Sequence, residues 1–576
     1  MLDTRIVGGT IVDGTGSVPY IGDVGIKDGR IVALGRVDEA AVRTINADGL
    51  AVTPGFIDVH THYDAQAFWD TTLSPSPLHG VTTVFGGNCG FTIAPLAGLG
   101  AEAFERDGDY LMRMLARVEG MPLESLQKGV PWDWRSTADY LNRLEGTLMP
   151  NAGFMVGHSA IRRVVMGDAA TSRHSTPEEL DLMVALLRDG LAAGGMGLTS
   201  TWSTSHNDHN GDPVPSRAAS RDELVALCRV VRDFPGTSLE FIPQVGEFTR
   251  DTFQLMTDMS LAAQRPLNWN LLQIYSVNRE SVDHQLGGGD FAEAQGGRVV
   301  ALALPDSFRL RLTFKSGFVL DILNGWDRLM ALDDTAKLAM MSDPSGRTEM
   351  ERLAQTTEGT VRSIANWGQY IVAETFAADN ARFVGRTIGD IATELGQTTW
   401  DTLCDIVVAD KLMTALKTPD RGQDEASWER RVEVFRDHRC LVGASDAGAH
   451  LDMIDTFAYS TQLLGNCVRK RSLMPIEEAI QLITDAPAKL YGVTDRGRLA
   501  VGMHADIVVL DPARIGTAEV HTKFDLPGGA GRIYAGAEGI EHVLVNGAMV
   551  VEGPEFTDAR PGTLIRSGSD TTTVSL

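Results

Sequence analysis

Residues 54–62 of the chain read Pro54-Gly55-Phe56-Ile57-Asp58-Val59-His60-Thr61-His62. A strand-like apolar run therefore ends in a His-x-His pair. Residues two apart in a strand point to the same face, so both imidazoles can reach one ion. The alternative is two surface histidines by chance, but the run before them is typical of a fully buried strand. We predict that His60 and His62 are metal ligands at the end of this strand.

Seven further strand-like runs follow this one and alternate with helical stretches. They cover residues 82–85, 152–156, 197–200, 238–242, 266–270, 299–302 and 440–445. With residues 55–60 they make about eight strands, the number that a closed (β/α)₈ barrel needs. A helix start is clear at Thr176-Pro177-Glu178-Glu179-Leu180, where proline and acids occupy the first turn. We predict an α/β fold, a distorted (β/α)₈ TIM barrel spanning residues 55–492.

Both ends of the chain have sequence patterns typical of short β-strands. The first fifty residues read as short strands with a hairpin signal at Asp28-Gly29, and apolar strand-like runs return at 505–512 and 542–547. We predict one small β-sandwich built from residues 1–54 and 493–576. Two stretches, near 97–148 and 305–439, are too long for simple connections, and we expect helical insertions over the barrel mouth there. Residues 567–573 are expected to fray.

Asp446 lies in Gly443-Ala444-Ser445-Asp446-Ala447-Gly448-Ala449-His450, directly after the last strand-like run. The small neighbours allow a metal or a substrate to come close. A carboxylate there can bind a metal and also take a proton from a bound water. For this stretch alone, a turn-forming aspartate is about as good an interpretation. The His-x-His pair favours the metal site, with Asp446 as a ligand and the general base.

Other polar residues follow the inner strands. Cys89, in Gly86-Gly87-Asn88-Cys89-Gly90, is either a thiolate ligand or a small buried hydrophobe, and its place at a strand end favours ligation. His158 follows the third strand and either lines the pocket or has a structural role. His206 and His209 are interpreted as loop residues. Glu240, within a strand, is interpreted as the partner of a base in preference to an extra metal ligand.

The composition narrows the class of protein. The chain has 576 residues, a net charge of −25 and 43% apolar residues. Such an acidic surface argues against binding to nucleic acid or to membranes. The five cysteines are widely spaced and form no C-x-x-C pair. The sequence also shows no signal-peptide pattern and no apolar run of about 20 residues. These three observations predict a cytoplasmic protein. Neither a phosphate-binding loop nor a G-x-S-x-G motif is present, which disfavours nucleotide binding and serine hydrolase chemistry. We expect a small-molecule substrate and leave homo-oligomerisation open.

Taken together, these motifs resemble the amidohydrolase superfamily, and within it the N-acyl-D-amino-acid deacylase (D-aminoacylase) branch. The resemblance covers most of the chain, including residues 54–62, 80–90, 157–166, 443–450 and 502–506. Asn88-Cys89-Gly90 is specific to this branch, because most other amidohydrolases bridge their metals with a modified lysine. The resemblance implies a barrel with a β-sandwich and makes His60, His62 and Cys89 metal ligands. It also implies that Asp446 is a ligand and the base, and that His158 and His450 lie near the substrate.

The chain departs from the family pattern at two strands. That pattern places metal-binding histidines after the fifth and sixth strands, but residues 238–243 and 266–273 contain no histidine. We therefore expect one zinc ion, in preference to two, held by His60, His62 and Asp446, with or without Cys89. Three protein ligands and a water would leave the open position that catalysis needs.

Three functions are compatible with these residues. The first is hydrolysis of a non-peptide C–N bond, the deacylation of an N-acyl (D-)amino acid or a related amide by a metal-activated water. The second is hydrolysis of a cyclic amide, lactone or ester at the same site. The third is a binding or scaffold protein that has lost catalysis, which the missing histidines suggest and the retained His60, His62 and Asp446 oppose.

Overall fold

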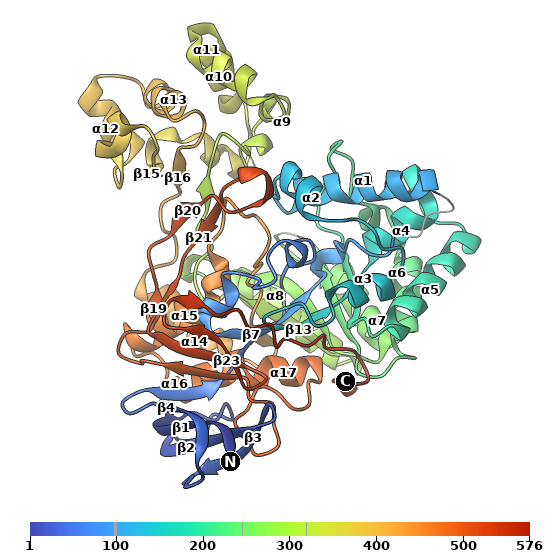
Figure 1. The fold of residues 1–576 in the computed structure, drawn as a ribbon. Helices are drawn as coiled ribbons and strands as arrows, with labels where there is room; N and C mark the ends of the chain where they lie inside the picture. The colour runs from blue at the N-terminus through green and yellow to red at the C-terminus, as the bar shows by residue number, and fades with distance from the viewer. Residues whose placement is uncertain (97–100, 245, 318) are drawn as a thin grey trace.

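The computed structural model of the chain describes residues 1–96, 101–244, 246–317 and 319–576. The two ends of the chain meet in one nine-stranded sheet, whose order is β25-β24-β23-β18-β5-β1-β2-β3 with β4 also paired to β1. β5 (Ala51–Pro54) lies between β1 (Leu2–Ile11) and β18 (Ile507–Leu510), and so joins the N-terminal strands to the C-terminal ones (Figure 1). The other strands are β2 (Tyr20–Lys27), β3 (Arg30–Gly35), β4 (Ala41–Asn46), β23 (Ile540–Val545), β24 (Ala548–Glu552) and β25 (Glu555–Phe556).

The turn between β2 and β3 is the hairpin predicted at Asp28-Gly29. Lys27 pairs with Arg30 across it. Asp28 and Gly29 have φ angles of 49° and 75°, and a tight two-residue hairpin of this kind needs positive φ at both positions. The prediction is confirmed.

Parallel strands make up the middle of the chain. β6 (Phe56–Asp58), β7 (Val81–Gly86) and β8 (Asn151–Phe154) pair in that order. A second sheet runs through β9 (Val156–Gly157), β10 (Gly197–Thr201), β11 (Ser238–Ile242), β12 (Leu267–Leu272), β13 (Val299–Ala303) and β17 (Cys440–Val442). Only Met155 separates β8 from β9, and a parallel bridge between Thr61 and Ala447 brings the chain after β17 back to the chain after β6. We call these strands the parallel ring.

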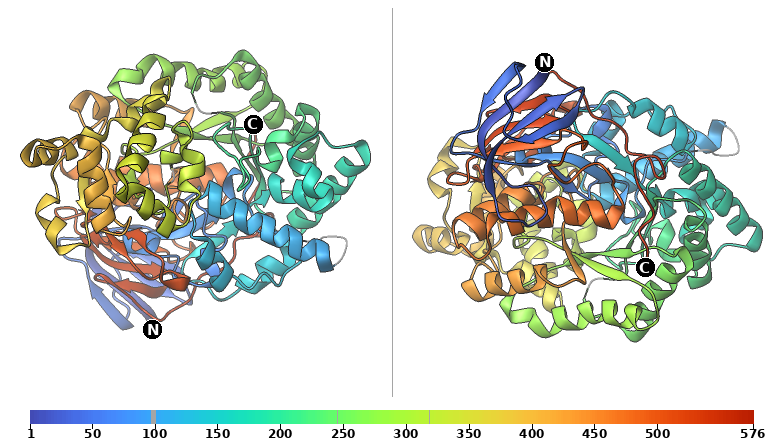
Figure 2. Two further views of the ribbon diagram at one scale, coloured as in Figure 1. Left: turned by 90° about the horizontal axis from the view of Figure 1, so that it is seen from above. Right: turned by 90° about the horizontal axis from the view of Figure 1, so that it is seen from below.

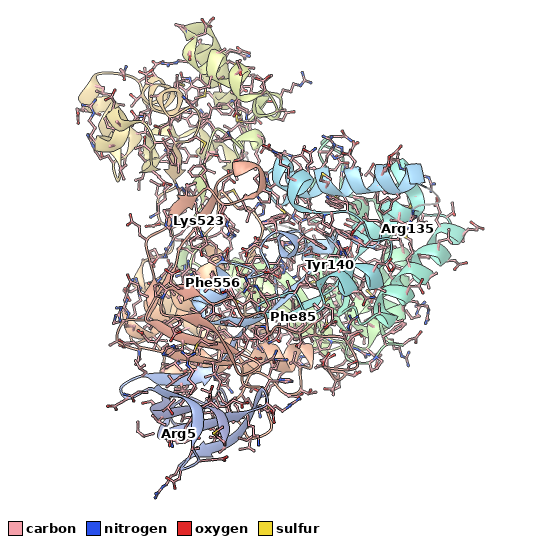
Figure 3. All side chains as sticks on the ribbon, viewed as in Figure 1. Arg5, Phe85, Arg135, Tyr140, Lys523 and Phe556 are labelled. Carbon is pink, nitrogen blue, oxygen red and sulfur yellow. The ribbon has the colours of Figure 1, made fainter. Side chains whose placement is uncertain are left out.

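Apolar side chains fill the inside of the ring. One cluster takes members from strands that are not neighbours in the ring, and such side chains can meet only inside it. Its members include Ile57, Phe85, Met155, Val300, Leu302 and Leu441. Phe85 of β7, which Figure 3 labels, packs against Tyr491 with ring centroids 4.6 Å apart.

Helices cover the outside of the ring (Figure 2). They are α4 (His158–Met166), α5 (Pro177–Ala192), α6 (Arg221–Val231), α7 (Arg250–Ala263), α8 (Arg279–Glu293), α14 (Glu425–Phe435), α16 (Ile476–Ile483) and α17 (Asp485–Tyr491). α5 begins where the sequence predicted, with Pro177 in its first turn and a reciprocal cap between Thr176 and Glu179. Within the described residues, no helix combines the length and the apolar character needed to cross a bilayer.

Two long segments lie apart from this framework. The first carries α1 (Ala101–Val118), α2 (Leu123–Gly129) and α3 (Thr137–Leu144). The second, residues 311–417, is here called the lobe and stands away from the ring in Figure 1. It contains α9 (Trp326–Met330), α10 (Asp334–Ser342), α11 (Pro344–Gln355), α12 (Ile388–Leu395), α13 (Thr399–Ala409) and the strands β14 (Arg311–Leu312), β15 (Ile371–Glu374) and β16 (Ala415–Lys417). Its apolar side chains form a core of their own.

The C-terminal tail contradicts its prediction. Residues 567–573 were expected to fray, but Thr571 is buried and its hydroxyl donates to the Gly236 carbonyl at 2.7 Å. The Thr572 amide donates to the Gly492 carbonyl at 2.8 Å. The prediction was wrong because the polar tail is held by carbonyls far away in the sequence.

The separate core of the lobe leads to a prediction for Trp400. Its indole is 1% exposed, packs against Trp367 with centroids 4.8 Å apart and donates to the Arg347 carbonyl at 2.9 Å. We expect Trp400→Ala to destabilise the lobe by about 3–5 kcal/mol while the ring stays folded. Hydrogen exchange should show faster exchange in α10–α13 and unchanged protection in β7 and β13. Leu332→Ala, at an exposed lobe position, is the control, and equal loss of protection in the ring would contradict the prediction.

Candidate metal centre

The predicted site residues lie where the first and last strands of the ring come together. The His62 amide donates to the Ala447 carbonyl at 2.8 Å, and the Asp446 amide donates to the His60 carbonyl at 3.1 Å. β6 ends at Asp58, two residues before His60, so both histidines lie beyond the strand. The backbone pairing continues past the end of β6 and holds the two histidines beside Asp446.

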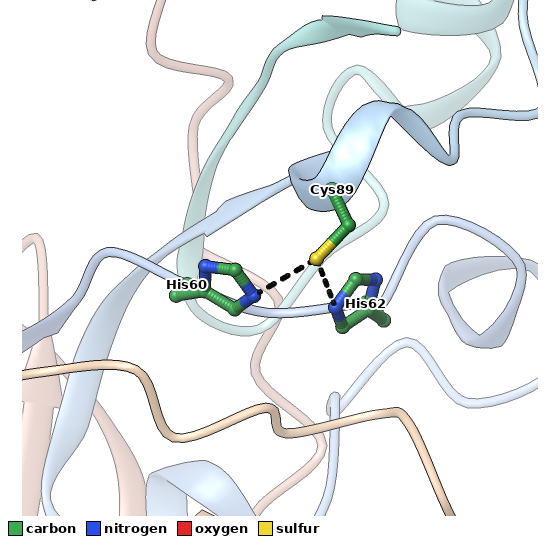
Figure 4. Close-up of side chains that lie close together, drawn as sticks. All are labelled: His60, His62 and Cys89. Atoms are coloured by element: carbon green, nitrogen blue, oxygen red, sulfur yellow. Dashed lines mark hydrogen bonds between the residues drawn. The ribbon is translucent and has the colours of Figure 1, made fainter. Parts of the chain in front are cut away.

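Four of the predicted side chains converge there. The Cys89 sulfur lies 3.4 Å from His60 Nε2 and 3.7 Å from His62 Nε2 (Figure 4). Asp446 Oδ1 lies 3.2 Å from His60 Nε2 and 3.1 Å from His62 Nε2. The donor atoms of His60, His62 and Cys89 all lie within 4.8 Å of one another, and Asp446 stands next to this group.

These separations fit a zinc site. Zinc binds nitrogen at about 2.0–2.1 Å and sulfur at about 2.3 Å, so two ligands of one tetrahedral zinc lie about 3.3–3.6 Å apart. The contacts between the two imidazoles and either Cys89 or Asp446 range from 3.1 to 3.7 Å. Imidazole, thiolate and carboxylate are also the ligand types that zinc takes in proteins. Both the donor set and its spacing are therefore those of a candidate metal centre.

The site is closed except at Asp446. The side chains of His60 and His62 are 2% and 1% exposed, whereas that of Asp446 is 24% exposed. Burial opposes ionisation, but the hydrogen bonds from His60 and His62 hold the pKa of Asp446 well below its usual range. Burial would also lower the pKa of His62, but the Glu119 and Asp446 carboxylates raise it to about 9. The environment of this solvent-facing carboxylate therefore favours its ionised form.

Further buried acids surround the four side chains. Burial raises the pKa of Asp58 to about 7, of Asp64 to about 6, of Glu119 to about 7 and of Glu240 to about 8. Buried carboxylates that ionise repel one another unless a positive charge lies among them. This concentration of acids around two imidazoles favours a bound cation.

Glu119 is a site residue that the sequence did not indicate. It follows α1, and its Oε1 lies 3.4 Å from His62 Nδ1. This contact is an ion pair and not a hydrogen bond. The negative charge on this side of the ring favours a proton on Nδ1 and leaves Nε2, the nitrogen facing Cys89 and Asp446, as the metal-binding atom. Its place within a long inserted segment carried no motif that could have revealed it.

Asn270 is the second residue that was missed, and it connects His60 to Glu240. The Asn270 side-chain nitrogen lies 2.5 Å from His60 Nδ1 and donates to Glu240 Oε1 at 2.7 Å. The other Glu240 oxygen accepts the Cys89 amide proton at 2.9 Å. Glu240 therefore lies behind two of the predicted ligands, bound to amide donors. The absence of histidine from β11 and β12, together with Glu240 itself, was the sequence signal in this region.

His158 and His450, the two histidines predicted to lie near the substrate, make different hydrogen bonds. Both ring nitrogens of His158 are engaged, with Ser200 Oγ at 2.8 Å and Glu223 at 2.9 Å. The backbone amide of His450 donates to the Glu119 carbonyl. The roles of His158 and His450 toward a substrate stay predictions.

His206 lies closer to the site than its interpretation as a loop residue suggested. Burial, and then the neighbouring His450, lower the pKa of His206 to about 3. Its ring packs against Phe91, two residues after Cys89, with centroids 5.0 Å apart. His209, in contrast, is exposed in the same loop.

A family comparison agrees with this geometry. The model of the amidohydrolase family matches residues 43–313 and 419–551, which is well over half of the chain. The chain belongs to the amidohydrolase family. The match contains His60, His62, Cys89 and Asp446, and it leaves out residues 314–418, which are most of the lobe.

Relatives place this amidohydrolase in the D-aminoacylase-like branch. It is 26% identical to D-aminoacylase of Alcaligenes xylosoxydans xylosoxydans, over 98% of this chain and 97% of the relative. It is 27% identical to N-acyl-D-aspartate deacylase of the same organism, over 98% and 95%. The fold is similar to a solved structure of D-aminoacylase, with a TM-score of 0.63 and 25% identity over 98% of this chain and 100% of that one. That structure was determined to study the binuclear metal centre of D-aminoacylase, in which one metal activates and the second attenuates.

The contact between Glu119 and His62 can be tested through metal affinity. Glu119→Gln keeps the size of the side chain but removes the charge that orients His62. We expect metal affinity to fall about 10–100-fold, as it does when such partners of ligating histidines are changed. Competition with a chromogenic chelator measures the affinity. Glu105→Gln, at an exposed position of α1, is the control and should leave the affinity unchanged. Unchanged affinity in Glu119→Gln would show that Glu119 has no such role.

Proposed function

We propose that this amidohydrolase is a metal-dependent deacylase that cleaves the C–N bond of an N-acyl (D-)amino acid or a related amide. One observation carries the proposal: His60, His62, Cys89 and Asp446 converge from three separate parts of the sequence at one end of the parallel ring. D-aminoacylase and N-acyl-D-aspartate deacylase, which match nearly the whole chain, support this class of substrate. We also propose that the parallel ring is a distorted (β/α)₈ barrel, with a β-sandwich formed by residues 1–54 and 493–576.

His60, His62, Cys89 and Asp446 would hold one zinc ion. When bound there, the ion would polarise the amide carbonyl and make a water molecule more acidic. Glu240 and Asn270 occupy the fifth and sixth strands of the ring, where the family resemblance places two metal-binding histidines. They are hydrogen-bonded to each other at 2.7 Å. This mutual bond favours a single ion over two.

Asp446 has the properties of the general base. Its pKa lies well below the usual range, so it is ionised at neutral pH. Its side chain is also the exposed one among the four, so it meets both the solvent and an incoming amide. It would accept a proton from the attacking water and deliver it to the departing nitrogen. His60 and His62, which are almost fully buried, both contact Oδ1 of this carboxylate.

Replacing the base tests this role. We expect Asp446→Asn to keep the fold and to lower kcat about 10²–10⁴-fold, because an amide cannot accept the proton. Turnover of N-acetyl-D-amino acids measures kcat, and circular dichroism checks the fold. Asp233→Asn, an exposed carboxylate of a surface ion pair, is the control. An Asp446→Asn variant with normal turnover would show that another group is the base.

Metal removal tests the centre itself. We expect the purified protein to contain about one equivalent of zinc and to lose hydrolysis of N-acyl amino acids on dialysis against a chelator. Re-addition of zinc should restore it. Metal analysis measures the zinc content of the wild type and of the His60→Ala and His62→Ala variants. A screen of N-acyl D- and L-amino acids measures hydrolysis. A metal-free protein that hydrolyses these amides at full rate would refute the proposal.

A further inference from the structure

A cavity lies next to the proposed metal centre, between the two inserted segments. Its volume is about 630 Å³, within the range of sites that enclose a drug-sized ligand. It is bordered by the end of α1, by the lobe and by the chain around β20 (His521–Lys523) and β21 (Arg532–Tyr534). In Figure 1 these two strands reach toward the lobe, and Figure 3 labels Lys523 there.

The cavity is separated from the centre by a single layer of residues. Gly120 lines the cavity, and Glu119 beside it contacts His62 at 3.4 Å. A Cβ atom on Gly120 would lie 3.3 Å from the Cα of His450, four residues after Asp446. Ile533 borders both the cavity and the small space beside Asp446. Ile533 is therefore the residue past which one end of a substrate held at Asp446 would reach the cavity.

The apolar part of the lining comes from all three bordering segments. It includes Ala116 and Met121 from the first insertion, Met330 and Met413 from the lobe, and Phe524 and Ile533 from the C-terminal segment. Methionine side chains are flexible and polarisable, so they adapt to apolar ligands of varied shape. This lining suits a hydrocarbon chain.

The cationic side chains of the lining are already paired with acids outside it. Each of the five arginine and lysine side chains in the lining has such a partner. The pairs are Arg113–Asp109, Arg117–Asp321, Arg311–Glu374, Lys315–Asp334 and Arg532–Asp525. Asp452 adds a further negative charge to the wall. The amino-acid half of the substrate carries a carboxylate, so the acyl half fits this cavity better.

We propose that the cavity is the acyl pocket of this deacylase and that its substrates carry apolar acyl chains much longer than acetyl. The inference rests on the proposed function. An acetyl group would leave most of the 630 Å³ unfilled, whereas each methylene that enters the pocket leaves water. Each added methylene is expected to raise kcat/KM by roughly threefold to fourfold until the pocket is full.

The test is an acyl-chain series on one amino acid. N-acetyl, N-hexanoyl and N-decanoyl derivatives are compared with the zinc-loaded protein, and we expect kcat/KM to rise on the order of 100-fold from acetyl to hexanoyl. A flat or falling series, with hydrolysis retained, would overturn the acyl pocket and leave the deacylase function standing. A gain from lengthening the amino-acid side chain of N-acetyl substrates, without one along the acyl series, would also overturn it. No hydrolysis of any member would overturn both proposals.

A variant with a larger side chain in the cavity lining tests whether the acyl chain binds in this cavity. Ala116→Phe places a ring into the cavity, and we expect the decanoyl-to-acetyl ratio of kcat/KM to fall at least tenfold. Ala185→Phe, at an exposed position of α5 away from the cavity, is the matched control and should keep the wild-type ratio. An unchanged ratio in a folded Ala116→Phe variant would overturn the assignment. If that variant does not fold, the acyl series on the wild type decides.

Discussion

The backbone pairing of residues 60–62 with residues 446–447 is the constraint on which the rest of the site depends. It joins the chain after the first strand of the ring to the chain after the last, through the His62–Ala447 and Asp446–His60 hydrogen bonds. Ser445 reinforces the junction, because its hydroxyl contacts Asp58 Oδ2 at 2.5 Å and the His60 carbonyl at 3.2 Å. Two imidazoles and a carboxylate from opposite ends of the fold are therefore held together by the main chain, before any ion adds its own attraction.

This junction also gathers negative charge in a place that water barely reaches. Asp58, Asp64, Glu119 and Glu240 all lie buried around the imidazoles, and burial raises the pKa of each. Such an arrangement is costly for a protein without a compensating cation. Binding a divalent ion would favour the ionised carboxylates and the folded state together, so metal affinity and stability are linked at this site.

The sequence predicted those parts of the molecule that are encoded locally. The strand that leads to His60, the Asp28-Gly29 hairpin and the start of α5 each follow from a short pattern of residues, and the structure contains all three. Glu119 and Asn270 could not be found in this way. Glu119 reaches His62 only because α1 ends beside the ring, and Asn270 contacts His60 only through the side-by-side order of the strands.

The C-terminal tail is also positioned by contacts that a local sequence pattern cannot reveal. Its small polar residues are typical of a frayed end, but hydrogen bonds to Gly236 and Gly492 hold it in place. Those partners lie about 80 or more residues earlier in the chain, and no local pattern records them. Predictions that depend on periodicity succeed here, whereas those that depend on non-local hydrogen bonds fail.

The first insertion contributes both to the proposed metal centre and to the proposed acyl pocket. The end of α1 carries Ala116 into the cavity wall and is followed by Glu119 on His62 and Gly120 against His450. Gly120 has a φ of 55°, and any side chain there would crowd His450, so only glycine suits the position. The lobe, which forms the facing wall, has its own core and lies outside the family match. Changes within the lobe can therefore reshape the cavity without moving a proposed metal ligand. Changes at the end of α1 would alter the cavity and the orientation of His62 together.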